Sequence, residues 1–239
     1  MKPLTLDGLG RLRVALLAAV ALAAAQGLVA AAPAQAGTGS GVYLVEDSGD
    51  NVLWFKDTKG VVNDVTIRGT TVTDAASPLV AGAGCANVDR HTVTCAAFSS
   101  GRTQIHLGPK DDRLINYGFT HPGLTHYAFG EQGDDIIRDY PHGGNISGGP
   151  GNDAIDLRGG ESGAGGGPGN DVLDARKGSN EFLYGGDGND VLFGGPGAFL
   201  YGENGNDWLD GIDPVLPHGA FKCDGGPGTN LVENCPPAS

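Results

Sequence analysis

Apolar and polar residues alternate over short distances along this chain, and no useful length keeps the spacing of an amphipathic helix. In residues 37–106, short runs rich in β-branched and aromatic residues are separated by turn-forming residues. These runs are Val42–Val45, Asn51–Phe55, Val65–Ile67, Thr92–Cys95 and Thr103–Leu107. We therefore predict an all-β N-terminal region. It would be either a small separate cap or, as we favour, the opening coils of the structure that follows.

A nine-residue pattern organises the second half of the chain. Its clearest copy is Gly185–Phe193, where a glycine-rich turn leads through Asn189 and Asp190 into a short strand-like segment. The glycines permit the tight turn, and asparagine tolerates a left-handed backbone. One apolar residue recurs in each segment, as Ile137, Ile155, Leu173, Leu192 and Leu209. A single apolar residue per copy cannot form a core, whereas stacked copies would join these residues into one column.

The spacing of the motif predicts its architecture. Its aspartate recurs at intervals of 18, 18, 19 and 17 residues, as Asp135, Asp153, Asp171, Asp190 and Asp207. Each interval holds two nine-residue units, so a complete coil carries one full motif and one weaker half-coil without aspartate. Residues 107–235 are thus predicted to form a parallel β-roll, or β-solenoid, with one edge rich in carboxylates and the opposite edge poor in them. The motif is degraded in Leu107–Leu114, and Asn230 stands where the last aspartate is expected.

The aspartates carry the candidate chemistry. Coils that stack as strands lie about 4.8 Å apart, so these carboxylates would repel one another unless cations bridge them. Ligand sets made only of oxygen, with flexible geometry, favour Ca²⁺ over a transition metal. The alternative is a glycine-rich turn array with solvated aspartates and no ion.

The motif resembles the RTX, or haemolysin-type, calcium-binding nonapeptide repeat. The resemblance implies a calcium-binding β-roll in which the five motif aspartates supply side-chain oxygens and turn carbonyls complete each site. The glycines of those turns are Gly133, Gly149, Gly151, Gly167, Gly169, Gly186, Gly188 and Gly205. Repulsion among the carboxylates further predicts that calcium binding is coupled to folding.

Residues 1–36 have the pattern of a secretory signal peptide. Lys2, Arg11 and Arg13 precede the apolar run Val14–Ala25, and Ala34–Ala36 supplies a small-residue cleavage pattern. The apolar run is shorter than the roughly 20 residues of a membrane span. Because of this segment we expect an extracellular protein. The whole sequence has a net charge of −13, so we expect an acidic protein that does not bind nucleic acid.

The four cysteines suit an exported chain, in which disulfides are favoured. Four cysteines allow three pairings, and the short separations favour Cys85 with Cys95 and Cys223 with Cys235. The second bridge would close the degenerate last repeat. Zinc is the weaker alternative, because the chain has no Cys-x-x-Cys.

No catalytic motif stands out in the sequence. His-Glu-x-x-His and Gly-x-Ser-x-Gly are both absent. We expect the six histidines to be surface or turn residues and Trp208 to point outwards. We therefore predict no enzymatic activity. The alternatives are an adhesive or glycan-binding module and a polysaccharide-modifying enzyme, and an exposed stripe of aromatic and basic residues on one face would favour either.

Overall fold

The computed structural model describes residues 40–47, 50–96, 102–118, 126–211 and 222–235. All regular secondary structure in these ranges is β-strand. Consequently, the described part of the chain contains no helix with the length and hydropathy of a membrane crossing. The expected signal peptide, residues 1–36, lies outside the described ranges.

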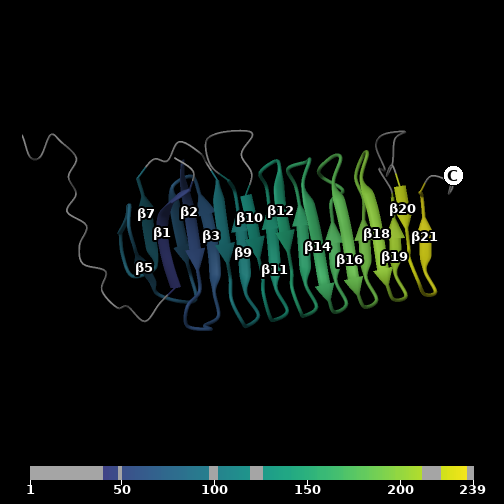
Figure 1. The fold of residues 1–239 in the computed structure, drawn as a ribbon, viewed down its shortest axis with the longest axis horizontal. Coiled ribbons are helices and arrows are strands. Elements are labelled where there is room, and N and C mark those ends of the chain that lie inside the picture. Colours follow the sequence, from purple (N-terminus) through teal and green to yellow (C-terminus); the bar gives the residue numbers. More distant parts are fainter. Residues whose placement is uncertain (1–39, 48–49, 97–101, 119–125, 212–221, 236–239) are drawn as a thin grey trace, which may run out of the picture. The chain divides into compact units, whose positions relative to one another are not determined.

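The strands form two sheets (Figure 1). In spatial order, the first sheet contains β20 (Lys222–Asp224), β18 (Phe199–Asn204), β16 (Phe182–Asp187), β14 (Gly163–Pro168), β12 (Gly144–Ser147), β10 (His126–Phe129), β8 (Thr103–His106), β2 (Asp50–Lys56), β1 (Ser40–Asp47) and β5 (Leu79–Ala81). The second sheet contains β21 (Leu231–Glu233), β19 (Trp208–Asp210), β17 (Val191–Phe193), β15 (Val172–Asp174), β13 (Ala154–Leu157), β11 (Ile136–Asp139), β9 (Arg113–Asn116), β3 (Asp64–Arg68), β4 (Thr71–Asp74), β7 (Thr92–Cys95) and β6 (Cys85–Asn87).

From β8 onwards, successive strands alternate between the sheets, and each strand pairs in parallel with the strand one coil away. The pairing keeps the repeat in phase: Ile137 pairs with Ile155, and Ile155 pairs with Leu173. These stacked parallel coils confirm the predicted all-β solenoid. The coils stay in register because each coil contains two nine-residue units. The same residue type therefore returns to the same place in every coil.

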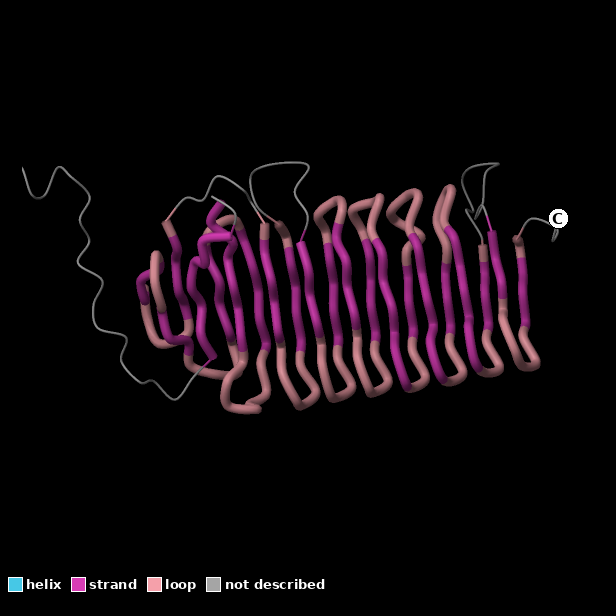
Figure 2. The backbone as a smooth tube through the Cα atoms, viewed as in Figure 1, coloured by secondary structure: helices cyan, strands magenta, loops and turns pink. Residues whose placement is uncertain are grey.

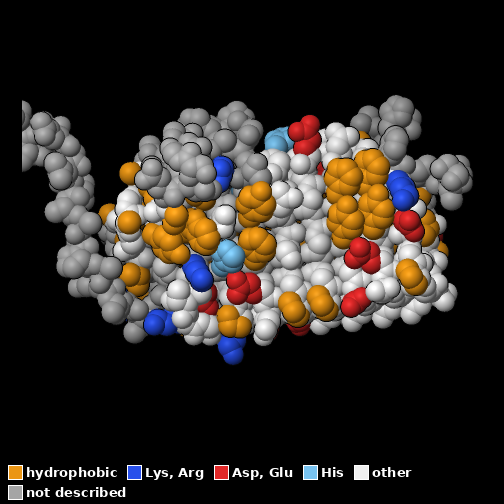
Figure 3. Space-filling model, viewed as in Figure 1, with side chains coloured by type: hydrophobic (Ala, Val, Ile, Leu, Met, Phe, Trp, Pro, Cys, Tyr) orange, Lys and Arg blue, Asp and Glu red, His pale blue; other side chains and the backbone are white. Residues whose placement is uncertain are grey.

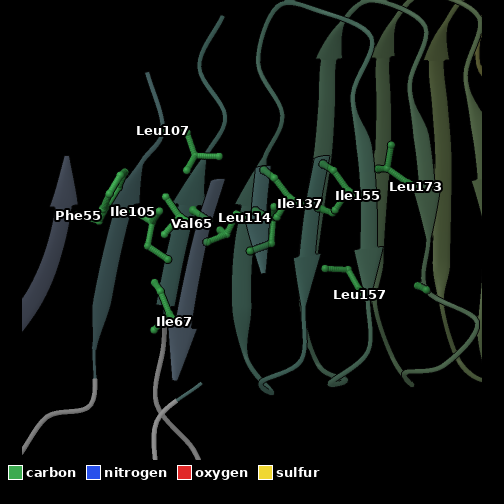
Figure 4. Close-up of a cluster of buried hydrophobic side chains, with 14 of the residues drawn as sticks. Phe55, Val65, Ile67, Ile105, Leu107, Leu114, Ile137, Ile155, Leu157 and Leu173 are labelled. Carbon is green, nitrogen blue, oxygen red and sulfur yellow. The ribbon is translucent and has the colours of Figure 1, made fainter. Parts of the chain in front are cut away.

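The core is the predicted apolar column together with a second column from the facing sheet (Figure 4). Ile137, Ile155 and Leu173 are at most 1% exposed, because alternate side chains of a strand point to opposite faces of the sheet. Leu192 and Leu209 continue their column. The facing column has smaller members, and its pairing runs through Ile105, Ala128, Ile146, Ala164, Leu183 and Leu200.

The N-terminal region is joined to the coils by hydrogen bonds. Its strands β2 and β3 pair in parallel with β8 and β9 and so form a coil of their own. Beyond this coil, β1 pairs antiparallel with β2, and β4, β7 and β6 extend the second sheet in antiparallel order. Cys85 and Cys95 are paired across β6 and β7 and form a disulfide. The antiparallel strands cover the first coil and thereby protect the edge that a solenoid would otherwise expose.

The C-terminal coil, β20 and β21, is the most open one. Val232 pairs with Leu209 and so stands in the apolar column, yet it is 44% exposed because no described coil stacks beyond it. A disulfide joins Cys223 of β20 to Cys235, which follows β21. This bridge closes the final coil covalently where packing is weakest.

Candidate calcium site

The repeat turns connect each first-sheet strand to the next second-sheet strand and lie along one edge, the lower edge in Figure 2. We call this the aspartate edge. All eight glycines named from the sequence adopt positive φ here. At Gly169 and Gly188 the backbone of the neighbouring coil imposes a second constraint, because a Cβ atom would clash with the carbonyl oxygens of Gly151 and Gly169. Only glycine lets the turns approach this closely.

The five motif aspartates form one ladder along this edge, and each is at most 2% exposed. In every case, Oδ1 accepts a hydrogen bond from the backbone N–H of the preceding ladder residue. For example, the Asp153 N–H donates to Asp171 at 2.7 Å, and the Asp171 N–H donates to Asp190 at 2.8 Å. The ladder thus links consecutive coils through side-chain to backbone hydrogen bonds.

The ladder is longer than the sequence indicated. The Asp112 N–H donates to Asp135 at 2.8 Å, and Asp112 Oδ1 in turn accepts from the Asn63 N–H at 2.6 Å. At the other end, the Asp207 N–H donates to Asn230 at 2.7 Å. An uncharged asparagine therefore occupies each end of a row of six carboxylates. The interval of 23 positions from Asp112 to Asp135, longer than a coil, concealed the first member, although its degraded motif was a usable signal.

The second carboxylate oxygen of each of these aspartates is buried without a hydrogen-bond partner. This Oδ2 atom is solvent-inaccessible in Asp112, Asp135, Asp153, Asp171, Asp190 and Asp207. It points into the turn, since a Cβ atom on Gly148 or Gly166 would clash with Oδ2 of Asp153 or Asp171. A buried polar atom without a partner costs free energy unless some other group satisfies it.

The electrostatics match this geometry. Burial raises the pKa of Asp112 and Asp135 to about 7, because the desolvated charge is disfavoured. It raises the pKa of Asp153, Asp171 and Asp190 to about 6. Hydrogen bonds from the ladder N–H groups oppose the rise, and neighbouring carboxylates add to it for most members. The row therefore favours either protonation or a bound cation near neutral pH.

The atoms at the aspartate edge fit a hard cation. The available ligands are carboxylate oxygens of successive coils and backbone carbonyl oxygens at the second and fourth positions of each nine-residue copy, such as Gly149 and Gly151. All of these are oxygen ligands, which Ca²⁺ prefers. Among the described residues, no three His, Cys, Asp or Glu side chains form a metal-binding group. Backbone carbonyls would accordingly have to complete each site. The second-position carbonyls include those of Glu131 and Glu203, which adopt positive φ as the equivalent glycines do.

The asparagine of the motif has a different role from the one expected. None of the four repeat asparagines adopts positive φ, so left-handed tolerance does not explain them. Instead they form a second, exposed ladder beside the aspartates: the Asn170 N–H donates to Asn152 Oδ1 at 2.9 Å, and the Asn189 N–H donates to Asn170 Oδ1 at 2.8 Å. The expected conformational role is therefore wrong, because the residue serves contacts between coils.

The opposite edge also departs from expectation. His126 was expected at the surface, but it is buried and its Nε2 lies 2.7 Å from Asp139 Oδ2. Asn116 donates to the other oxygen of Asp139 at 2.8 Å. Glu181 is likewise fully buried, and burial raises its pKa to about 7. The opposite edge therefore holds buried acidic groups, which the repeat pattern did not reveal. Of the other histidines, His121 and His218 lie outside the described residues.

The geometry defines a class of protein: a parallel β-solenoid whose glycine turns hold a row of buried carboxylates. A family model described as the RTX calcium-binding nonapeptide repeat (4 copies) matches residues 165–198 and 199–211. The chain thus carries RTX-type repeats, as the motif predicted. The presence of such repeats on a β-solenoid supports the interpretation that this chain is a calcium-binding protein. Neither the curated proteins nor the solved structures contain a match to this chain.

Proposed function

We propose that the chain is a secreted, non-catalytic calcium-binding protein whose aspartate edge holds Ca²⁺ between coils and couples calcium to folding. The proposed ligands are the side chains of Asp135, Asp153, Asp171, Asp190 and Asp207, with carbonyl oxygens of the turns. Those carbonyls belong to or adjoin Gly133, Gly149, Gly151, Gly167, Gly169, Gly186, Gly188 and Gly205. We add Asp112 to this set because it belongs to the same ladder.

One observation carries the proposal: every ladder aspartate keeps a buried Oδ2 atom that no protein group satisfies. The other oxygen already accepts a backbone N–H, so hydrogen bonding between coils alone does not explain the carboxylate. An asparagine would suffice for that bond, as Asn230 shows at the end of the ladder. The negative charge at the six inner positions is therefore best explained by a cation.

Coupling to folding follows from the same atoms. A ligand that binds only the folded state stabilises it by RT ln(1 + [L]/Kd), which is about 1.4 kcal/mol per site at ten times Kd. Several such sites together rival the roughly 5–15 kcal/mol stability of an ordinary domain. Without the ion, the buried charges oppose folding. In a compartment with little calcium the chain would stay loosely structured, which suits export.

We propose further that residues 40–235 fold as one unit, since β2 and β3 of the N-terminal region share sheets with the repeat coils. The extracellular location is supported by the signal-like residues 1–36 and by two disulfides. No partner other than calcium follows from the aspartate edge itself.

Far-UV circular dichroism of the chain without residues 1–36 tests the proposal. The spectrum and the melting temperature would be measured with a chelator, with millimolar Ca²⁺ and with millimolar Mg²⁺. We expect the chelator to remove much of the β signal, calcium to restore it and magnesium to restore it poorly, because Mg²⁺ requires tighter octahedral coordination. The same spectrum and melting temperature in all three solutions would contradict the proposal.

A further inference from the structure

The outward face of the first sheet carries two groups of aromatic side chains with a gap between them (Figure 3). On one side of the gap, β10 presents Tyr127 and Phe129. On the other side, β16 presents Phe182 and Tyr184, backed by Phe199 and Tyr201 of β18. The strands between them, β12 and β14, present only short side chains: Asn145, Ser147, Gly163 and Gly165. We call the surface of these four residues the β12–β14 gap.

The β16 wall of the gap presents ring faces rather than ring edges. Phe182 stacks on Phe199 with centroids 4.7 Å apart and planes 6° apart, and Tyr184 stacks on Tyr201 at 5.0 Å and 8°. One face of Phe182 and one face of Tyr184 are therefore covered by β18 of the next coil. The other face points towards β14, where glycine provides no side chain to cover it. The exposed fractions of Phe182 and Tyr184, 42% and 40%, agree with this arrangement.

The floor of the gap is open and polar. A Cβ atom placed on Gly165 would meet no atom within 4 Å. A Cβ atom on Gly163 would lie 3.5 Å from Asn145 Oδ1, so the amide of Asn145 lies beside this bare strand. Asn145 and Ser147 supply hydrogen-bond donors and acceptors between the aromatic walls. None of the residues that form the walls or the floor is charged.

The dimensions decide between a small ligand and a protein partner. The wall strands β10 and β16 are three strand spacings apart, about 14 Å, and the two outward residues of each strand are about 7 Å apart. This footprint is on the order of 100 Å², far below the roughly 800 Å² that each partner buries in a stable protein interface. A second copy of the chain is therefore a poor occupant, whereas a ring-shaped ligand is well matched.

We propose that the β12–β14 gap binds a neutral polysaccharide, with a sugar ring placed against the open faces of Phe182 and Tyr184. The C–H face of a pyranose is apolar and packs on an aromatic face, while its hydroxyl groups hydrogen-bond in the ring plane to Asn145 and Ser147. The uncharged lining matches a neutral ligand, and the net charge of −13 disfavours an anionic one. This site is separate from the aspartate edge.

Two measurements on the calcium-loaded full chain test the proposal. The first is retention of the protein on powdered cellulose, chitin and starch. The second is calorimetric titration with the hexasaccharide of the polysaccharide that retains it. We expect retention on at least one powder. Tyr184→Ala removes a ring face, and Gly165→Leu fills the gap at a position where a Cβ atom is unhindered. Each should weaken binding about tenfold, while circular dichroism and calcium affinity stay unchanged.

Trp208→Ala is the matched control, because Trp208 is an exposed aromatic residue (38%) on the second sheet. This variant should bind as the parent chain does. The proposal is overturned by no retention on any of the three powders, by parent-like binding of Gly165→Leu, or by an equal loss in Trp208→Ala. It is also overturned if sedimentation shows self-association that Gly165→Leu abolishes, which would make a second copy the occupant.

Discussion

Replacing Asp171 by asparagine separates the two roles of a ladder carboxylate. Asparagine keeps an oxygen that can accept the Asp153 N–H, as Asn230 does for Asp207 at 2.7 Å. Its amide nitrogen replaces the unpartnered Oδ2 and can donate to a turn carbonyl, as Asn230 donates to Gly226 at 3.0 Å. The substitution therefore preserves the link between coils and removes only the charge. We expect it to stabilise the calcium-free protein and to weaken calcium binding.

The magnitude follows from the pKa of Asp171. Burial raises this pKa from 3.8 to about 6, and one pKa unit corresponds to about 1.4 kcal/mol. At pH 7.5, where the carboxyl group is ionised in both states, the burial of its charge therefore costs about 3 kcal/mol. Asp171→Asn should recover a large part of that free energy without calcium. The gain should shrink towards pH 4, where the folded wild-type protein holds the proton instead.

The far-UV circular dichroism signal that remains in chelator, at pH 7.5 and pH 4.5, measures the first effect, because Asp171→Asn should keep more β signal than the parent chain at pH 7.5. Calorimetric titration with calcium measures the second. Asp171→Ala is the informative comparison, since it removes the same charge and also the acceptor for the Asp153 N–H, so it should be less stable than Asp171→Asn at both pH values. Asp210→Ala lies outside the ladder and should leave calcium affinity nearly unchanged. The reasoning is refuted if Asp171→Asn destabilises the calcium-free protein at pH 7.5, or if it binds calcium as the wild type does.

Three further results are expected. The β signal that the calcium-free protein retains should fall as pH rises from about 4 to 7, because the raised pKa values of the buried ladder carboxyls make the folded state bind more protons. A circular dichroism signal in chelator that does not change with pH would contradict this. Leu173→Ala should lower the free energy of unfolding by about 2–5 kcal/mol, because Leu173 is fully buried. Val172→Ala, at a 42% exposed position, should change this free energy far less. Equal losses of unfolding free energy in urea titrations of the two variants would place the core elsewhere. Peptide mapping of the unreduced protein should recover the Cys223–Cys235 linkage. The double variant Cys223→Ser, Cys235→Ser should exchange amide hydrogens faster in β20 and β21 but not in β14. Equally faster exchange in all three strands would argue that the disulfide does not act only on the final coil.

The sequence determined the fold class and the position of the aspartate edge, because both are properties of a repeat. A constant step of about 18 residues returns Asp153 and Asp171 to equivalent places in successive coils. Alternation along a strand then directs Ile155 and Leu173 inwards. Neither result depends on contacts between unlike segments. Local pattern alone was sufficient for them.

Only the tertiary structure decided the features that depend on which side chains meet across coils. Three of these features are contacts between residues 13 to 23 positions apart in the sequence. They are the hydrogen bond of Asn170 to Asn152, the contact of buried His126 with Asp139, and the hydrogen bond that joins Asp112 to the ladder. The β12–β14 gap likewise exists because the glycines of β14 stack beside the aromatic residues of β16. A single asparagine, histidine or glycine in the sequence does not reveal which side chain it will contact in a neighbouring coil. Their roles follow from the register of the stacked coils and from burial, which takes away the water that would otherwise satisfy these polar groups.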